Sequence, residues 1–176
     1  MEQTNGLMRR VHRASPIAAA LAVGLTSLTG CAEAPPCSIA AELKDSRRGD
    51  SGCLVATNAA VLVIRHRLGG QLGIPGGAAA PGGSAQCTAH RETWEETGLD
   101  VRVGRFLGRL DTGFLVYQCD AGAPPPRARQ LAVPPAALAE VTGIFWADPA
   151  DLRAGDWRFP DQLPAIRAML ESLERP

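Results

Sequence analysis

Three glutamates within five residues are the side chains of this chain best spaced to act together. Residues 84–98 read SAQCTAHRETWEETG, and a helix there places Glu92, Glu95 and Glu96 within about 100° of one another. Two of them lie in the last helical turn, where the helix dipole disfavours each anion by roughly 0.3–1 kcal/mol. A divalent cation would reverse this cost, and oxygen ligands suit Mg²⁺ or Mn²⁺. The alternative for this pattern taken alone is a solvated acidic face on a surface helix.

Start and stop signals frame the glutamates. Ser84 is placed to cap a helix over 85–97, and Gly98 supplies its C-terminal stop. The preceding stretch, LGGQLGIPGGAAAPGGS, is too rich in glycine to be helical. It contains Gly76-Gly77 after a predicted strand, and Arg91 directly precedes the first glutamate. This context favours a metal site over a solvated acidic face.

The segment 77–99 closely resembles the Nudix box. In this motif a glycine, five residues, a glutamate and seven residues precede R-E-U-x-E-E-x-G-U, where U is apolar. The residues that match its second half are Arg91, Glu92, Glu95, Glu96, Gly98 and Leu99. Two positions depart from it, because Thr93 stands where an aliphatic residue is usual and Gly83 stands where the first glutamate is expected.

The resemblance implies both a fold and an activity. It implies an α/β fold, a Nudix-type α/β/α sandwich with a mixed β-sheet, over residues 51–176. Nudix enzymes hydrolyse a pyrophosphate joined to another group, usually a nucleoside diphosphate derivative, and use Mg²⁺ or in some cases Mn²⁺. By position, Glu92, Glu95, Glu96 and the backbone carbonyl of Gly76 are implied as metal ligands.

Catalytic roles follow from the same resemblance. Glu96 ranks first among the implied ligands, and Glu92 is also placed to orient or deprotonate the attacking water. Many relatives use a further carboxylate from a later loop. Glu140, just before a predicted strand, is the nearest candidate, whereas Asp111 and Asp120 are expected to be ordinary loop acids.

The glycine at position 83 affects the loop that precedes the helix. In the family, the arginine at the position of Arg91 braces this loop, with the first box glutamate as its partner. Gly83 removes that partner here. We therefore predict a looser loop over 77–84 and weaker metal binding.

Several other side chains could reach a substrate, but each has a simpler structural interpretation. Arg65 and Arg67 follow a predicted strand and could contact a phosphate, although exposed arginines at strand ends are common. The residues expected to serve mainly as surface or packing residues are His66, His90, Trp94, Trp146 and Trp157.

The N-terminus has the pattern of an export signal. Three arginines precede an apolar stretch over 16–28, which is short for a membrane span and is followed by Cys31 within the sequence LTGC. This resembles the signal sequence and lipobox of bacterial lipoproteins. It implies that residues 1–30 are removed, that a lipid on Cys31 anchors the protein, and that the protein lies on the periplasmic face of a membrane. That membrane would be the outer membrane in a Gram-negative source; the alternative is an ordinary signal peptide with a cysteine nearby.

Four cysteines remain after the predicted cleavage site. They are Cys37, Cys53, Cys87 and Cys119. In an exported protein an even count permits two disulfides with three possible connectivities, and we expect at least one. The polar segment 31–50 has no convincing periodicity and is interpreted as a tether.

The rest of the chain alternates between strand and helix patterns. β-Branched and apolar runs predict strands, a Pro-rich stretch predicts a loop over 120–135, and helical spacing predicts a terminal amphipathic helix. The predicted strands are 52–57, 61–66, 99–110, 113–119 and 140–147, and the terminal helix is 161–173.

The charge balance and the motifs together limit the possible functions. Eighteen basic and eighteen acidic residues leave no net charge, so binding to a nucleic acid polymer is not expected. The first hypothesis is a Mg²⁺-dependent Nudix pyrophosphohydrolase of the cell envelope, acting on a small-molecule diphosphate. The alternatives are a non-catalytic Nudix-fold module that binds a diphosphate, which Gly83 motivates, and a structural lipoprotein with a fortuitous acidic helix.

Overall fold

The computed structural model describes residues 34–57, 60–122 and 129–174. The predicted signal sequence over 1–30 and the proposed lipid site at Cys31 lie outside the described residues. Within the described ranges, no helix is both long enough and apolar enough to cross a membrane.

The described strands form one mixed sheet. Its order is β5-β6-β1-β2-β8-β7, with β3 paired to β2 and β4 paired to β1. Strands β1 and β6 run parallel, whereas the other pairs run antiparallel. The strands are β1 Ser51–Thr57, β2 Ala60–His66, β3 Leu72–Gly73, β4 Gly76–Gly77, β5 Arg102–Arg109, β6 Leu115–Asp120, β7 Gln130–Leu131 and β8 Val141–Ala147.

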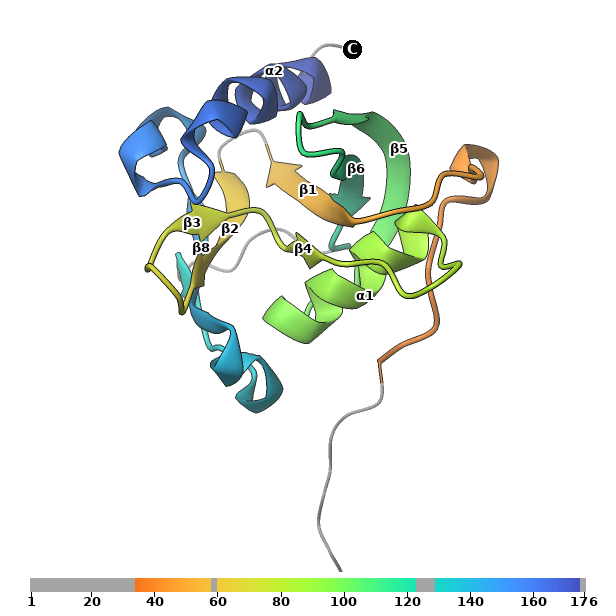
Figure 1. Ribbon diagram of the computed structural model, residues 1–176, viewed down its shortest axis with the longest axis horizontal. Coiled ribbons are helices and arrows are strands. Elements are labelled where there is room, and N and C mark those ends of the chain that lie inside the picture. Colours follow the sequence, from red (N-terminus) through yellow and green to blue (C-terminus); the bar gives the residue numbers. More distant parts are fainter. Residues whose placement is uncertain (1–33, 58–59, 123–128, 175–176) are drawn as a thin grey trace, which may run out of the picture. The chain divides into compact units, whose positions relative to one another are not determined.

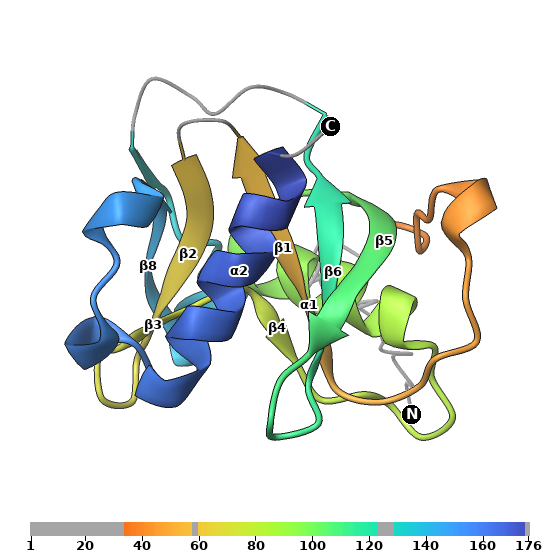
Figure 2. The same cartoon turned by 90° about the horizontal axis from the view of Figure 1, so that it is seen from above.

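Two α-helices cover opposite faces of this sheet. Figures 1 and 2 show α1, Ala85–Thr97, on one side of the strands and α2, Leu163–Glu174, on the other. This is the predicted α/β/α sandwich with a mixed sheet. Short 3₁₀ turns fill the connections: η1 Ala41–Leu43, η2 Pro135–Ala139, η3 Pro149–Asp151, η4 Ala154–Asp156 and η5 Pro160–Gln162.

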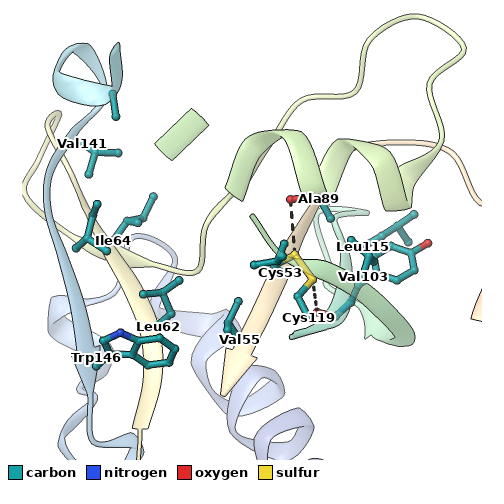
Figure 3. Close-up of a cluster of buried hydrophobic side chains, with 14 of the residues drawn as sticks. Cys53, Val55, Leu62, Ile64, Ala89, Val103, Leu115, Cys119, Val141 and Trp146 are labelled. Carbon is teal, nitrogen blue, oxygen red and sulfur yellow. Dashed lines mark hydrogen bonds between the residues drawn. A yellow bond between two sulfur atoms is a disulfide. The ribbon is translucent and has the colours of Figure 1, made fainter. Parts of the chain in front are cut away.

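The central strands are buried on both faces because side chains alternate across a strand. On the α1 side, Cys53, Leu62 and Leu115 pack with Ala89 of the helix (Figure 3). On the α2 side, the buried strand residues are Leu54, Val61, Val63 and Val116, and the helix residues are Ile166, Met169 and Leu170. This double burial explains why β1 and β2 read as continuous apolar runs rather than as alternating ones.

Most predicted elements lie within a few residues of the observed ones, and the helix over 85–97 matches α1. The glycine-rich and Pro-rich stretches hold short strands that their composition hides, namely β3, β4 and β7. Ser84 does occupy the N-cap position, but its side chain makes no capping hydrogen bond. The first helical N–H, of Ala85, instead donates to the carbonyl of Arg47 (2.9 Å).

Residues 34–50 do not form the tether that was predicted for 31–50. Ile39 forms a parallel bridge with Val103 of β5 and packs against the core on the α1 side. The N–H of Ala40 donates to the Val103 carbonyl (2.9 Å). These backbone contacts have no periodic signature, which is why the segment looked unstructured in the sequence.

The structure pairs the four cysteines as two disulfides. Cys37 joins Cys87 with 5.3 Å between Cα atoms, and Cys53 joins Cys119 with 5.4 Å between Cα atoms. Both separations lie in the usual range for a disulfide. The second bond joins the parallel strands β1 and β6 beneath α1 (Figure 3).

Leu62→Ala should destabilise the protein by about 2–5 kcal/mol, because it leaves a cavity in the layer between the sheet and α1. Leu62 is fully buried, whereas Leu68 is 88% exposed. Leu68→Ala is therefore the matched control and should change stability by no more than about 0.5 kcal/mol. Chemical denaturation of both variants measures the difference. Equal effects would contradict the assignment of Leu62 to the core.

Candidate active site

The carboxylates of α1 line a cleft of about 440 Å³ at the end of the sheet where β4 meets the helix. Its walls come from the β2–β3 connection, β4 and the residue that follows it, α1, the end of η2 and the segment before η5. The lining residues that matter for chemistry are His66, Arg67, Gly76, Gly77, Arg91, Glu92, Glu95, Glu96, Glu140 and Arg158. The cleft therefore combines one acidic wall with several basic side chains.

Glu96 is the most deeply placed of the acidic residues. It is 6% exposed, and one of its carboxylate oxygens accepts a hydrogen bond from the N–H of Gly76 (2.8 Å). Burial raises its pKa to about 8, with the charges of Glu92 and Glu140 acting in the same direction. The Gly76 hydrogen bond and Arg158 oppose this shift. A buried carboxylate that is crowded by two others is a strong candidate for binding a cation.

Glu92 lies directly against the glycine backbone of β4. A Cβ atom placed on Gly77 would come within 2.4 Å of a Glu92 carboxylate oxygen, so the glycine leaves room for the Glu92 side chain in its present position. Burial raises the pKa of Glu92, while its ion pair with Arg91 (2.5 Å) lowers it. The short strand and the helix thus hold the carboxylate in place from two sides.

Glu95 is turned toward the rim. Its side chain is 50% exposed and pairs with Arg91 (2.8 Å). Among the described residues, no three His, Cys, Asp or Glu side chains converge closely enough to form a ready-made metal site. Glu95 therefore lines the same cleft as Glu92 and Glu96 but is directed to Arg91 rather than to a common point with them.

Glu140 lines the cleft from the end of η2, opposite the helix that carries the other glutamates. It follows η2 directly, and its backbone carbonyl accepts a hydrogen bond from the N–H of Arg67 (2.7 Å). Its charge raises the pKa of both Glu92 and Glu96. The structure thus brings Glu140 to the same cleft as Glu92 and Glu96, which precede it in the sequence by 48 and 44 residues.

The basic side of the cleft contains Arg67, His66 and Arg158. The side chain of Arg67 is oriented by a hydrogen bond from its Nε to the Leu138 carbonyl (2.6 Å). His66 Nδ1 lies 3.4 Å from Arg158 Nη1. Burial and the charge of Arg158 lower the pKa of His66 to about 4, so its ring is neutral near pH 7 and accepts this hydrogen bond.

Arg158 is a cleft residue that the sequence analysis missed, and His66, which was expected to be a surface or packing residue, also lines the cleft. The backbone N–H of Arg158 donates to the Leu72 carbonyl (2.8 Å), and this bond brings the segment to β3 beside the cleft. The neighbouring Trp157 is a core residue, and no spacing pattern in the sequence marked Arg158 as part of the cleft.

Other candidates lie outside the cleft, in line with their structural interpretation. Asp120 sits at the end of β6, where it accepts from the N–H of Gly122 (2.8 Å), and Asp111 lies in the exposed turn between β5 and β6. The guanidinium of Arg65 donates to the Gly70 carbonyl (2.7 Å). His90 is buried and pairs with Asp100 (3.0 Å). The tryptophans Trp146 and Trp157 are core residues, and Trp94 is half-buried.

The unusual Thr93 has a local explanation. It is fully buried on the sheet side of α1, and its hydroxyl donates to the carbonyl of Ala89 one turn earlier (2.8 Å). A threonine can take a buried helical position when its hydroxyl is satisfied in this way.

Arg91 keeps its bracing role without the missing glutamate. One guanidinium nitrogen donates to the carbonyl of Ala78 (2.8 Å), while the same group pairs with Glu92 and Glu95. The loop over 77–84 has further partners in residues 47–50. The structure thus supplies this loop with contacts that Gly83 cannot provide.

In the absence of a divalent cation, Glu96→Gln should raise the melting temperature relative to the wild type at about pH 8, but not at about pH 5. The folded protein keeps the Glu96 proton up to its raised pKa of about 8, whereas the unfolded chain releases it at a much lower pH. Wild-type stability from this group is therefore lost as the pH rises through that interval. Thermal melts in chelator at both pH values measure the difference. An equal effect of the substitution at both pH values would contradict the raised pKa.

The NUDIX domain family matches residues 46–172. A search of curated proteins finds no match to the chain.

Three solved structures illustrate the likeness. An ADP-ribose pyrophosphatase from Streptococcus suis is 20% identical, with a TM-score of 0.53 over 72% of this chain and 91% of its own. A UDP-X diphosphatase is 16% identical, with a TM-score of 0.54 over 72% of this chain and 63% of its own. An Ap4A hydrolase from C. elegans is 15% identical, with a TM-score of 0.53 over 70% of this chain and 97% of its own. At these identities the structures share a fold with this chain, and the family match, which covers most of its length, shows that the chain belongs to the NUDIX domain family.

Proposed function

We propose that this protein hydrolyses the pyrophosphate bond of a small-molecule diphosphate, with Mg²⁺ as its cofactor and Mn²⁺ as a substitute. The observation that carries the proposal is the buried carboxylate of Glu96, crowded by Glu92 and Glu140 in a cleft that also holds Arg67 and Arg158. Hydrolysis of a diphosphate requires both kinds of charge. Cationic groups neutralise the phosphate oxygens, and a carboxylate accepts the proton of the attacking water.

The donor set of the cleft fits a hard divalent cation. Carboxylate oxygens are the preferred ligands of Mg²⁺. Burial and, after it, the neighbouring negative charges raise the pKa values of Glu92 and Glu96, and a bound cation would relieve the repulsion between them. The glycine backbone at position 77 leaves no room for a side chain beside Glu92. The residues that would hold the ion are Glu92, Glu96, Glu95 and the backbone carbonyl of Gly76.

The side chains of the cleft would bind the substrate phosphates and accept the proton of the attacking water. A bound Mg²⁺ would neutralise phosphoryl charge and lower the pKa of a coordinated water. Arg67 and Arg158 attract the substrate phosphates into the cleft, and neutral His66 holds the Arg158 guanidinium through its ring nitrogen. Glu92 or the exposed Glu140 accepts the proton of the attacking water, since both carboxylates border the same cleft.

The substrate class follows from the chemistry of the cleft and from the relatives. The similar structures are an ADP-ribose pyrophosphatase, a UDP-X diphosphatase and an Ap4A hydrolase. The compounds in these three names each contain a phosphoanhydride linked to a nucleoside. We therefore place the substrate of this chain among nucleoside-diphosphate-linked or related compounds.

The proposed location is the periplasmic face of a bacterial membrane. The basic and apolar N-terminal segment followed by Cys31 supports export and lipid attachment. The two disulfides support an oxidising compartment, because such bonds persist outside the cytosol. In a Gram-negative source, the outer membrane is the proposed destination.

A non-catalytic diphosphate-binding module is the second candidate. It is favoured by two observations, the absent glutamate at Gly83 and the pairing of Glu95 with Arg91. It predicts ligand binding without turnover, which the assay below separates from hydrolysis.

Incubation of the purified full chain with Mg²⁺ and a panel of diphosphate-linked compounds should release phosphate or a nucleoside monophosphate from at least one of them. Glu96→Gln should lower this rate by about 10²-fold or more, because the substitution removes the buried anionic ligand. Glu171→Gln, on α2 outside the cleft, is the matched control and should retain the rate. Binding of the same compounds without turnover would support the binding module instead.

Gly77→Ala should abolish the rise in melting temperature that Mg²⁺ produces in the wild type. The added Cβ atom would displace the Glu92 carboxylate, which lies 2.4 Å from its position. Gly155→Ala is the matched control, because a Cβ atom at Gly155 meets nothing within 4 Å. Thermal melts with and without Mg²⁺ give the readout, and a retained Mg²⁺ response in Gly77→Ala would exclude Glu92 as a ligand.

A further inference from the structure

We propose that residues 37–50 form a strap that positions the glycine-rich loop over 77–84 and the first turn of α1, and that the Cys37–Cys87 disulfide is its covalent anchor. The catalytic consequence rests on the proposed function, because the strap acts on the elements that carry the cleft carboxylates. Figure 1 shows this segment, in orange, passing beside the N-terminal end of α1.

The strap binds three consecutive residues of α1. The Arg47 carbonyl accepts from the N–H of Ala85 (2.9 Å), which is one of the helix's unpaired N-terminal donors. The side-chain amide of the fully buried Gln86 donates to the Leu43 carbonyl (3.0 Å) and accepts from the N–H of Asp45 (2.9 Å). Cys87 carries the disulfide to Cys37. The first turn is thus capped, hydrogen-bonded and cross-linked by the same segment.

The strap also holds the loop along its length. Asp50 accepts a hydrogen bond from the N–H of Ala79 (3.0 Å). Arg48 forms a backbone bridge with Ser84 and donates from its guanidinium to the carbonyl of Gly82. The loop is therefore held from outside at Ala79 and Gly82 by charged side chains of the strap, and at Ser84 by its backbone.

The strap has a rigid support of its own. Ile39 is bridged to Val103 of β5 and packs on the core. Asp45 accepts from the Tyr117 hydroxyl of β6 (3.2 Å), and the Arg47 guanidinium lies 4.0 Å from the centroid of the Phe106 ring. Movements of the loop are therefore resisted by the sheet itself.

The loop in turn touches the site. The Ala78 carbonyl accepts from Arg91, which also pairs with Glu92 and Glu95. Loosening of the loop would release Arg91 from Ala78 and change its charge pairing with both glutamates.

Position 83 explains why an external strap is needed. Gly83 has no side chain with which to brace the loop from within, and a cavity of about 250 Å³ borders Gly83, Arg91 and Cys37. The strap approaches this cavity from the Cys37 side and supplies the bracing through Arg48 and Asp50 instead.

The anchor is open to reductants. Cys37 is exposed and Cys87 is half-buried, whereas Cys53 and Cys119 are buried. A dithiol reductant would transfer two electrons to the Cys37–Cys87 bond, giving two thiols and the oxidised reductant, while the buried disulfide is shielded. Reduction should therefore release the strap before it affects the core.

Hydrogen exchange of the full chain without Mg²⁺ tests the strap independently of activity. Arg48→Ala should speed amide exchange over 77–84 roughly tenfold, the factor that corresponds to one lost hydrogen bond. It should also raise the Mg²⁺ concentration needed for half-maximal stabilisation, and Arg48→Lys should restore part of both effects. Arg153→Ala is the matched control, because Arg153 also donates to a loop carbonyl, that of Ala150 (2.6 Å), but away from the cleft. Unchanged exchange over 77–84 in Arg48→Ala would overturn the proposal.

Mild reduction provides the second arm. Wild-type protein in which mass spectrometry shows only Cys37 and Cys87 reduced should exchange faster over 77–84 and bind Mg²⁺ more weakly. A Cys37→Ser, Cys87→Ser double variant should show the same properties and should not respond to the reductant. Identical exchange and Mg²⁺ binding in the oxidised and reduced protein would overturn the role of the anchor. If the wild type hydrolyses nothing but its loop still responds to the strap, the proposed function fails while the positioning role stands.

Discussion

The candidate site depends on the close approach of a glycine backbone to the carboxylates of α1. The N–H of Gly76 binds Glu96, and the bare Cα of Gly77 leaves room for Glu92. This approach is possible only because β4 pairs with β1 and α1 packs across the same strand. The sheet, the two-residue strand β4 and the helix α1 therefore pack as one unit, and the acidic cluster lies where these three elements meet.

The acidic cluster has an electrostatic cost in free energy, and other groups of the cleft offset part of it. Burial disfavours the ionised form of Glu96, and Glu92 and Glu140 add repulsion. Arg158 and the Gly76 N–H oppose both effects, and Arg91 does the same for Glu92. Without a bound cation, the acidic cluster therefore lowers local stability.

The sequence predicted the parts of the fold that rest on local patterns. The acidic helix, its glycine stop, the paired apolar strands and the terminal amphipathic helix follow from spacing and composition, and their observed bounds agree within a few residues. The resemblance of the helix to a known box added the α/β/α sandwich and brought Glu140 into consideration. Glu140 indeed borders the cleft with Glu92 and Glu96.

Contacts between distant backbone segments could not be predicted in the same way. Residues 38–50 bind through carbonyls, single bridges and one buried amide, none of which leaves a period in the sequence, so the segment was wrongly interpreted as a tether. The place of Arg158 depends on its N–H reaching Leu72, and the direction of Glu95 depends on Arg91. Each is a consequence of tertiary packing that one-dimensional spacing does not encode.

The two disulfides interleave along the chain, because Cys53 lies between Cys37 and Cys87, and Cys87 lies between Cys53 and Cys119. Taken alone, each loop, of 50 and 66 residues, stabilises the fold by roughly 4 kcal/mol through the entropy of the unfolded chain. Their overlap has a further effect on proteolysis. A protease that cuts the exposed glycine-rich loop separates Cys37 and Cys53 from Cys87 and Cys119, yet both disulfides still join the two pieces. The nicked protein would thus remain one covalent molecule, with its acidic helix still tied to the sheet.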